Sequence, residues 1–174
     1  RRFERAMAAA ESGIDPLTGL RSRVGMQDDL ARELNRYLRT RKPFCLALMD
    51  IDHFKKINDS YGHENGDKVL SSIADYISRS VRPFDDVWRW GGEEILLCLK
   101  DVDFKAGRGV LERIRSGLEK LPIRLLDGKE INVTASFGLT SVDPDSTIDS
   151  LLAKADRALY TAKMNGRNKV ALLG

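Results

Sequence analysis

Short apolar runs alternate along this chain with longer stretches in which apolar residues recur every three or four positions. The run over 44–50 is almost wholly apolar and short, which predicts a buried strand. Further apolar runs predict strands over 86–90, 94–99 and 169–172. Apolar residues occupy every second position from Ile131 to Leu139, which predicts a half-buried strand.

The period of three to four residues predicts helices between these strands. Pro43 and Pro83 each follow a predicted helix, because proline lacks the N–H that would continue it. The predicted helices cover residues 22–40, 54–58, 66–81, 103–120 and 148–164. In the first of them one face is expected to carry Val24, Leu30, Leu34, Tyr37 and Leu38.

Two glycine-containing pairs between strands predict hairpins. Gly91-Gly92 separates strands 86–90 and 94–99, and glycine accepts positive φ at little cost. Asp127-Gly128 is a second hairpin signal. Because helices and hairpin-connected strands are mixed, we expect an α+β domain with a largely antiparallel central sheet flanked by helices.

Size and composition are those of one globular domain. The chain has 174 residues, of which 42% are apolar and 32% charged. The net charge of +3 is too small to indicate nucleic-acid binding by itself. No apolar run approaches the roughly 20 residues that span a membrane, and no signal peptide is visible. The two cysteines, Cys45 and Cys98, are expected to pack as small apolar residues in a reducing cytoplasm.

The chain starts at Arg1 without Met, in a polar and Ala-rich helical stretch. We interpret residues 1–13 as the end of a connecting helix that Gly13 terminates, following an upstream region of a longer protein. The compact domain would then occupy residues 14–174.

Two acidic clusters suggest chemistry. Glu93 and Glu94 follow the glycine pair at a hairpin tip, and Asp50-Ile51-Asp52 ends the buried strand. Concentrated negative charge at such places favours a bound cation, and Mg²⁺ prefers oxygen ligands. A solvated turn is the better interpretation of the glutamates taken alone, because short motifs match by chance.

Six motifs in a fixed order make the chain resemble a GGDEF domain, the catalytic domain of diguanylate cyclases. The resemblance covers Asp15 to Val170, and Ile95 stands where the family usually has Phe. The motifs are Asp15-Pro16-Leu17-Thr18-Gly19-Leu20, the run Met49 to Asp59, Tyr61-Gly62-His63 with Gly66-Asp67, the run Arg89 to Ile95, Ala155-Asp156 with Leu159-Tyr160, and Lys163 with Gly166-Arg167-Asn168. The resemblance implies a fold like the palm of polymerases and nucleotidyl cyclases.

The resemblance also implies a reaction, in which two GTP molecules condense to cyclic di-GMP and two pyrophosphates. By the match, Asp50, the carbonyl of Ile51 and Glu93 bind Mg²⁺, for which Mn²⁺ is the alternative, and Glu94 assists at a second ion. Glu93 is the family's candidate for accepting the proton of the attacking hydroxyl. Lys55 matches a position that stabilises the transition state.

Substrate contacts follow from the same match. Asn58 and Asp67 match the positions that read guanine, with His63 beside them, and a carboxylate can accept two hydrogens that adenine cannot supply. Lys163 and Arg167 lie four apart, so they are expected to share a helix face. By the match, they correspond to the family's ligands of the triphosphate. The remaining contact candidates are Phe54, Gly91, Gly92 and, more weakly, Arg89.

Simpler interpretations exist for several of these residues. His63 alone would more often cap a helix or lie in a loop. Lys163 and Arg167 alone would be favourable charges near a helix C-terminus, and Phe54 alone would be a core residue. Only the ordered set of motifs favours the functional interpretation.

Arg82 and Asp85 form an R-x-x-D pattern with five residues between Asp85 and Gly91. This is the family's spacing for a site where the product inhibits. Arginine suits that site, because it can stack on guanine and bind its edge or a phosphate. Arg113 lies where a second inhibitory arginine is often found, and a solvated helix residue is the alternative.

A catalytically degenerate domain that only binds GTP or cyclic di-GMP is the main alternative. Intact Asp50, Glu93, Lys55 and Asn58 argue against it, and Asp67 argues against a cyclase of altered base choice. A polymerase is remote, because the chain lacks room for a template channel.

The reaction implies a homodimer, since each domain supplies half a site, and an upstream sensory or dimerisation region would direct it. We expect no contact of this domain with nucleic acid or membrane and a cytoplasmic location, although the full-length protein could be anchored through the upstream region.

Overall fold

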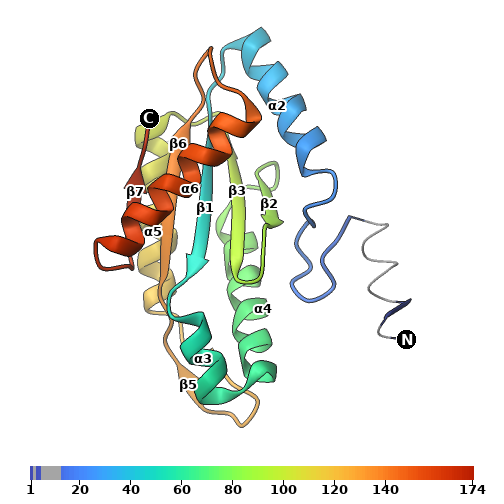
Figure 1. Ribbon diagram of the computed structural model, residues 1–174, viewed down its shortest axis with the longest axis vertical. Helices are drawn as coiled ribbons and strands as arrows, with labels where there is room; N and C mark the ends of the chain where they lie inside the picture. The colour runs from blue at the N-terminus through green and yellow to red at the C-terminus, as the bar shows by residue number, and fades with distance from the viewer. Residues whose placement is uncertain (2, 5–12) are drawn as a thin grey trace.

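The computed structural model describes residues 1, 3, 4 and 13–174, and the predicted connecting helix over 1–13 lies largely outside them. In this part of the chain a five-stranded sheet has the order β2-β3-β1-β6-β7 (Figure 1). Strand β1 pairs antiparallel with β3 and β6, β2 pairs antiparallel with β3, and β7 runs parallel to β6. The prediction of a largely antiparallel sheet is therefore confirmed. The strands are β1 Phe44–Ile51, β2 Asp86–Arg89, β3 Glu94–Lys100, β6 Ala135–Ser141 and β7 Val170–Leu172.

Helices cover both faces of the sheet (Figure 1). Helices α4 and α5 pack on one face and α2 and α6 on the other, and α3 follows the end of β1. A separate two-stranded hairpin joins β4 Ile123–Arg124 to β5 Glu130–Ile131 through Gly128 at a φ of 88°, as Asp127-Gly128 predicts. The helices are α2 Met26–Thr40, α3 Phe54–Tyr61, α4 His63–Ser80, α5 Phe104–Glu119 and α6 Ile148–Met164.

The helices bury both faces of β1, which explains its unbroken apolar sequence. Ala47 and Met49 pack with residues of α4 and α5, whereas Leu46 and Leu48 pack with residues of α2 and α6. All eight residues of β1 are buried. The strand therefore holds the groups at its end in a fixed position. Cys45 and Cys98 are both buried, as expected.

The strand predicted from the alternation over 131–139 is the main difference. Strand β5 ends at Ile131 in the separate two-stranded hairpin, and β6 begins at Ala135 in the five-stranded sheet, so two strands in different sheets replace one. The prediction of a half-buried strand is wrong, because α6 covers the second face of β6. A Cβ on Gly138 would lie 2.2 Å from the carbonyl oxygen of Ala155, so a glycine allows α6 to approach this closely.

The first predicted helix starts too early. Gly25 has a φ of 81°, and α2 begins only at Met26. Val24 and Leu38 are 65% and 43% exposed, so they do not lie on its buried face, which includes Glu33 instead.

The Gly91-Gly92 hairpin is confirmed, because β2 and β3 pair antiparallel. Neither glycine has a positive φ, so the stated reason is wrong. A Cβ at either would meet no atom within 4 Å, and what the pair provides is open space. No helix in the described part of the chain is long and apolar enough to cross a membrane.

Candidate active site

The end of β1 brings several acidic side chains together. Asp50 is 6% exposed and lies directly opposite Glu94 of β3 and Ser136 of β6. Like charges that face each other across strands are unfavourable. Lys163 of α6 forms an ion pair with Asp50 on this face of the sheet.

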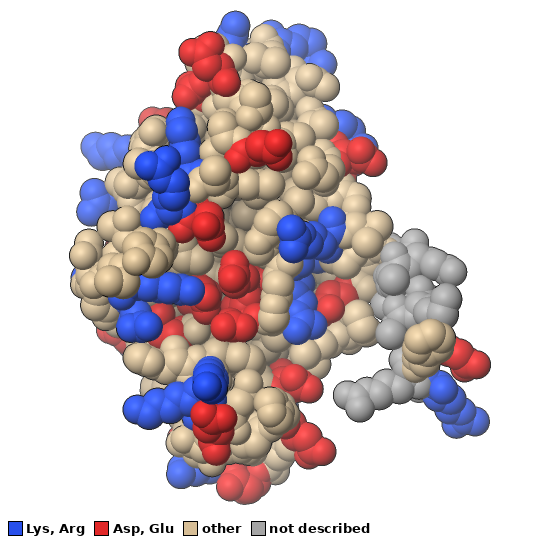
Figure 2. Space-filling model, in the orientation of Figure 1, with Lys and Arg blue, Asp and Glu red and all other residues tan. Residues whose placement is uncertain are grey.

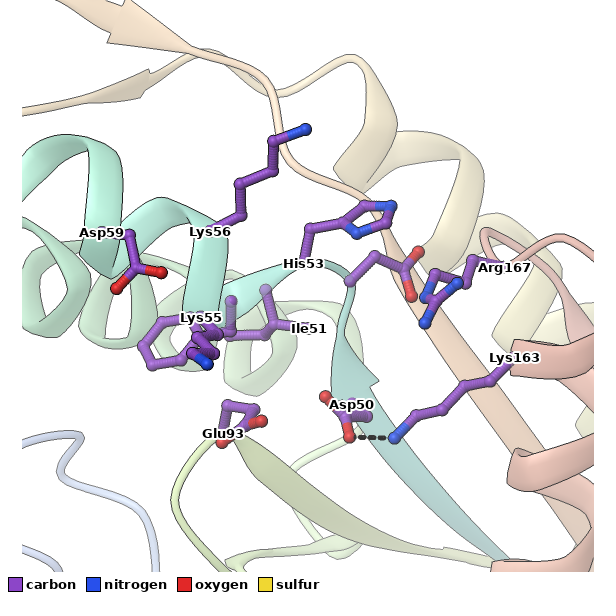
Figure 3. Close-up of a pocket in the computed structure, with 11 residues that line it drawn as sticks. Asp50, Ile51, His53, Lys55, Lys56, Asp59, Glu93, Lys163 and Arg167 are labelled. Atoms are coloured by element: carbon purple, nitrogen blue, oxygen red, sulfur yellow. Dashed lines mark hydrogen bonds and ion pairs between the residues drawn. The ribbon is translucent and has the colours of Figure 1, made fainter.

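A pocket of about 430 Å³ opens at this end of β1, and we call it the β1-end pocket. Figure 2 shows Asp and Glu side chains gathered in a hollow in the middle of this face, with Lys and Arg side chains beside them. In Figure 3, Lys55, Glu93 and Lys163 turn toward the space in front of Asp50. The pocket is lined by Asp50, Ile51, Asp52, His53, Phe54, Lys55, Lys56, Asp59, Glu93, Lys163 and Arg167.

The electrostatics of this pocket reflect crowded carboxylates. Burial raises the pKa of Asp50, the ion pair with Lys163 opposes the rise, and the charges of Glu93 and Asp52 add to it. Burial also raises the pKa of Glu94, and the charge of Asp50 contributes next. Burial and the neighbouring carboxylates thus disfavour the charged forms of Asp50 and Glu94, while Lys55, Lys56, Lys163 and Arg167 line the same pocket and face its carboxylates.

The donor set fits a hard divalent cation that shares its coordination with a ligand. In the described part of the chain no three His, Cys, Asp or Glu side chains form a ready metal cage. Asp50 and Glu93 nevertheless face one pocket from two neighbouring segments. Mg²⁺ is commonly bound in this way, by one or two carboxylates together with substrate phosphates and waters.

The basic residues of this pocket come from two helices. Lys55 lies in the first turn of α3, and Lys163 lies in the last turn of α6. Arg167 follows the end of α6 and has a φ of 63°, so it does not share a helix face with Lys163 as predicted. Both side chains still line the β1-end pocket, because the loop after α6 turns back toward it.

The residues expected to read guanine lie at the junction of α3 and α4, outside the lining of this pocket. A Cβ on Gly66 would fall 1.7 Å from Oδ1 of Asn58, so the amide of Asn58 rests on α4 at Gly66, the residue before Asp67. His63 is the first residue of α4 and is exposed. Asn58 lies on α3, the helix that also contributes Lys55, and its amide reaches α4 at the residue that precedes Asp67.

Arg89 braces the hairpin. Its guanidinium forms an ion pair with Asp15 at 3.0 Å and donates to the carbonyl oxygen of Gly92 at 3.0 Å. Gly91, Gly92 and Arg89 line a separate pocket of about 260 Å³. The partner Asp15 was not identified as a site residue from the sequence, since it lies 74 residues away.

Phe54 combines its two expected roles. It packs against the core on the α4 and α5 side, and it also lines the β1-end pocket. The backbone of Ile51 is similarly tied to the hairpin, because its N–H donates to the carbonyl oxygen of Glu93 at 3.4 Å.

A third pocket contains the residues expected at an inhibitory site. Arg82 and Asp85 form an ion pair at 3.2 Å, and Asp85 also accepts from the backbone N–H of Lys100 at 3.0 Å. Arg113 of α5 donates to the carbonyl oxygen of Ser80 at 3.2 Å. We call this pocket of about 190 Å³ the Arg82 pocket, and its lining is Ser80, Val81, Arg82, Asp85, Leu99, Val102, Val110 and Arg113.

Comparison with known sequences identifies the family to which this chain belongs. The model of the family described as "Diguanylate cyclase, GGDEF domain" matches residues 12–169. Diguanylate cyclase DgcP of Pseudomonas aeruginosa is 39% identical over 156 residues, which cover 90% of this chain and 23% of that protein. Diguanylate cyclase A of Treponema denticola is 43% identical over 133 residues, covering 76% of this chain and 36% of that protein. The chain thus spans about a quarter to a third of the length of these curated relatives.

Solved structures of diguanylate cyclases are similar to this chain in fold. Diguanylate cyclase SiaD from Pseudomonas aeruginosa, solved with its activator SiaC, has a TM-score of 0.87 at 36% identity, covering 99% of this chain and 67% of that one. The coiled coil and GGDEF domain of DgcB from Caulobacter crescentus, solved with c-di-GMP, has a TM-score of 0.89 at 30% identity, covering 99% and 91%.

Proposed function

The chain belongs to the GGDEF family of diguanylate cyclase domains, and we propose that it condenses two GTP molecules into cyclic di-GMP. Its sheet and helices form the palm fold of nucleotidyl cyclases. In each half of the reaction a 3′-oxygen bonds to the α-phosphorus of the other GTP, the bond to pyrophosphate breaks, and the hydroxyl proton leaves. Two such steps close the ring and release two pyrophosphates.

One observation supports the reaction most directly: Asp50 and Glu93 face a single pocket that also contains Lys55, Lys163 and Arg167. Carboxylates that converge beside cationic side chains suit a triphosphate bound with a divalent cation. Asp50, the carbonyl of Ile51 and Glu93 would hold Mg²⁺ or Mn²⁺. The ion, when bound, would neutralise charge that develops on the phosphates.

Glu94 would assist a second ion from its position opposite Asp50. Lys163 and Arg167 would bind the triphosphate, and Lys55 would stabilise charge in the transition state. Glu93 is the proposed acceptor of the hydroxyl proton, since its carboxylate faces the pocket in which the reacting groups would meet.

Guanine would lie at the junction of α3 and α4. Asp67 would accept hydrogens from N1 and the exocyclic amine, and the amide of Asn58, which rests on Gly66 beside it, would complete the recognition. His63 at the start of α4 would lie alongside the base. This arrangement would discriminate against adenine, which lacks both of those donors.

The Arg82 pocket would bind the product. Asp85 orients Arg82 through the backbone N–H and the guanidinium of that arginine, which leaves a planar cation beside Arg113. The solved complex of DgcB with c-di-GMP supports binding of this dinucleotide by a domain of this family. Occupancy would inhibit by favouring an arrangement in which two domains cannot meet productively.

Catalysis would require a homodimer. Each GTP must present its 3′-hydroxyl to the α-phosphate of the other, so two β1-end pockets have to face each other. A region outside residues 14–174 would bring the domains together in response to a signal.

The alternative is a domain that binds GTP or cyclic di-GMP without turnover. Incubation of the domain at high concentration with GTP and Mg²⁺, followed by mass spectrometry, separates the two functions. We expect cyclic di-GMP and pyrophosphate from GTP, and no cyclic dinucleotide from ATP or after chelation of the metal. Binding of GTP without any dinucleotide product would favour the alternative.

A further inference from the structure

The loop after α6 has an unusual backbone. Gly166, Arg167 and Asn168 have φ values of 111°, 63° and 45° in succession. Residues with a Cβ rarely adopt positive φ, and two in sequence persist only where the surroundings fix them. Because Arg167 lines the β1-end pocket, the contacts that fix this loop also decide where its guanidinium points.

One of these contacts comes from Asp52, just beyond β1. Asp52 is 5% exposed, and its Oδ2 accepts a hydrogen bond from the backbone N–H of Asn168 at 3.0 Å. The same carboxylate accepts from the hydroxyl of Thr134 at 2.7 Å and from that of Ser136 at 2.6 Å. Both oxygens of Asp52 are therefore engaged by the protein.

A second set of contacts comes from α5. Oδ1 of Asn168 accepts from Arg115 at 2.9 Å, and its amide nitrogen donates to Glu119. The two helical residues also form an ion pair with each other at 3.3 Å. Asn168 is thus held through its backbone by Asp52 and through its side chain by Arg115 and Glu119 of α5.

We propose that Asp52 and Asn168 are positioning residues, which lock the loop in its left-handed conformation and so aim Arg167 into the β1-end pocket. No residue in the described part of the chain makes a hydrogen bond or ion pair with the guanidinium of Arg167, so its direction depends on the backbone of the loop. The inference rests on the proposed function in one respect, the binding of a triphosphate by Arg167.

The hydrogen bonds of Asp52 distinguish a positioning role from metal binding. In an Asp52→Asn protein, the amide oxygen can still accept from Thr134 and from the N–H of Asn168. The amide nitrogen can donate to Ser136, because a hydroxyl accepts as well as donates. If Asp52 positions the loop, the change to Asn should therefore keep its function, whereas the change to Ala removes every contact of the carboxylate. If Asp52 instead bound a metal ion through its charge, both changes should abolish its function.

The test combines amide hydrogen exchange of segment 165–169 with calorimetry of a non-hydrolysable GTP analogue and Mg²⁺. The variants are Asp52→Ala, Asp52→Asn and Arg167→Ala. We expect Asp52→Ala to lose the protection of the Asn168 amide and to bind the analogue about tenfold more weakly, as Arg167→Ala does, in line with other residues that orient a ligand-binding group. Asp52→Asn should retain both properties within about threefold.

Unchanged protection in Asp52→Ala, or an Asp52→Asn protein as impaired as Asp52→Ala, would overturn the proposal. If Asp52→Ala does not fold, Asn168→Ala takes its place, since it removes only the contacts to α5. Protection and affinity both equal to wild type in Asn168→Ala would then contradict the inference.

The proposed function fails in a different way. If Arg167→Ala binds the GTP analogue with wild-type affinity, Arg167 does not bind the triphosphate. The loop would then have no role in directing Arg167 toward that ligand. Hydrogen exchange measures the anchoring without nucleotide, so a domain that makes no cyclic di-GMP would still report whether Asp52 holds Asn168.

Discussion

The β1-end pocket and the Arg82 pocket arrange charge in opposite ways. In the first, Asp50 is buried beside Glu93 and Glu94, and burial together with neighbouring carboxylates raises its pKa despite Lys163. In the second, Asp85 is satisfied by the Arg82 side chain and by two backbone N–H groups. One pocket thus crowds buried carboxylates together with cationic side chains, whereas the other uses an acid to orient arginine.

The difference indicates different ligands. Crowded carboxylates with cationic side chains beside them suit a metal-bound triphosphate. A fixed arginine next to Arg113 suits a flat, anionic ligand without a metal. The pockets share no lining residue and come from different segments, so substitutions should affect them separately.

Glu93→Gln should have the largest effect. The amide keeps the size of the side chain but removes the charge of a proposed metal ligand, so product formation should fall by at least about a hundredfold. Initial rates with GTP and Mg²⁺ measure this. Asp149→Asn, an exposed carboxylate in the first turn of α6, is the matched control and should remain active. A Glu93→Gln protein with a near wild-type rate would contradict the assignment.

Asp67→Ser should reduce the preference for GTP over ATP. The change removes the proposed acceptor of two guanine hydrogens, which is worth about 1–3 kcal/mol of discrimination. Competition between the two nucleotides measures it, and Asp75→Ser on the same helix is the control. An unchanged preference would mean that Asp67 does not read the base.

Arg82→Ala should affect the other pocket. Loss of a charged donor predicts about tenfold weaker binding of cyclic di-GMP, or ~1.4 kcal/mol, with little change in the initial rate. Calorimetric titration tests this against Arg79→Ala, whose side chain is exposed and pairs with Asp75. If wild type, Arg82→Ala and Arg79→Ala bind cyclic di-GMP with equal affinity, Arg82 and Asp85 are surface charges without a role in binding.

Gly66→Ala should act through Asn58 without changing any charge. The added methyl group would occupy the space of the Asn58 amide, whose end can move, so the fold should persist. Loss of one hydrogen bond to the base predicts a rise in KM of about fivefold, or ~1 kcal/mol. Steady-state kinetics measure this change, and affinity for cyclic di-GMP in the Arg82 pocket should not change.

The smallest expected effect concerns the ion pair between Asp15 and Arg89 beside the hairpin. Burial alone would raise the pKa of Asp15, but hydrogen bonds from Thr18 and the charge of Arg89 outweigh it, so the pKa lies below the ordinary 3.8. The stabilisation is therefore present above that ordinary value and is lost as the pH falls through the folded pKa. Asp15→Asn should lose this part of the acid sensitivity, with a difference in unfolding free energy within about 1 kcal/mol.

Acid titrations followed by thermal unfolding measure that difference. An Asp15→Asn protein with the same acid sensitivity as wild type would show that the brace contributes nothing to stability. The Arg82 pocket should be unaffected, because Asp15 bonds to Thr18 and to Arg89 of the hairpin and lines neither that pocket nor the segments around it.

Much of the fold could be predicted from the sequence because the sheet is buried on both faces. Strand β1 appears as one apolar run, and α6 was predicted with its observed bounds. The half-buried strand failed, since local alternation does not reveal that α6 covers β6 through the close approach at Gly138.

The site was less accessible to sequence reasoning. Lys163 and Asp50 meet across 113 residues, and only the family resemblance placed them together. Asn165-Gly166 marks a turn after α6, but the contact of Asp52 with Asn168 spans 116 residues and no local pattern predicts it. Long-range contacts of this kind become visible only in the folded chain.

The most direct test titrates wild type, Glu93→Gln and Arg82→Ala with a non-hydrolysable GTP analogue plus Mg²⁺ and, separately, with cyclic di-GMP. The account predicts that Glu93→Gln weakens only the analogue and that Arg82→Ala weakens only cyclic di-GMP. If either variant weakens both ligands, or neither variant weakens any, the two pockets do not have the separate functions assigned to them.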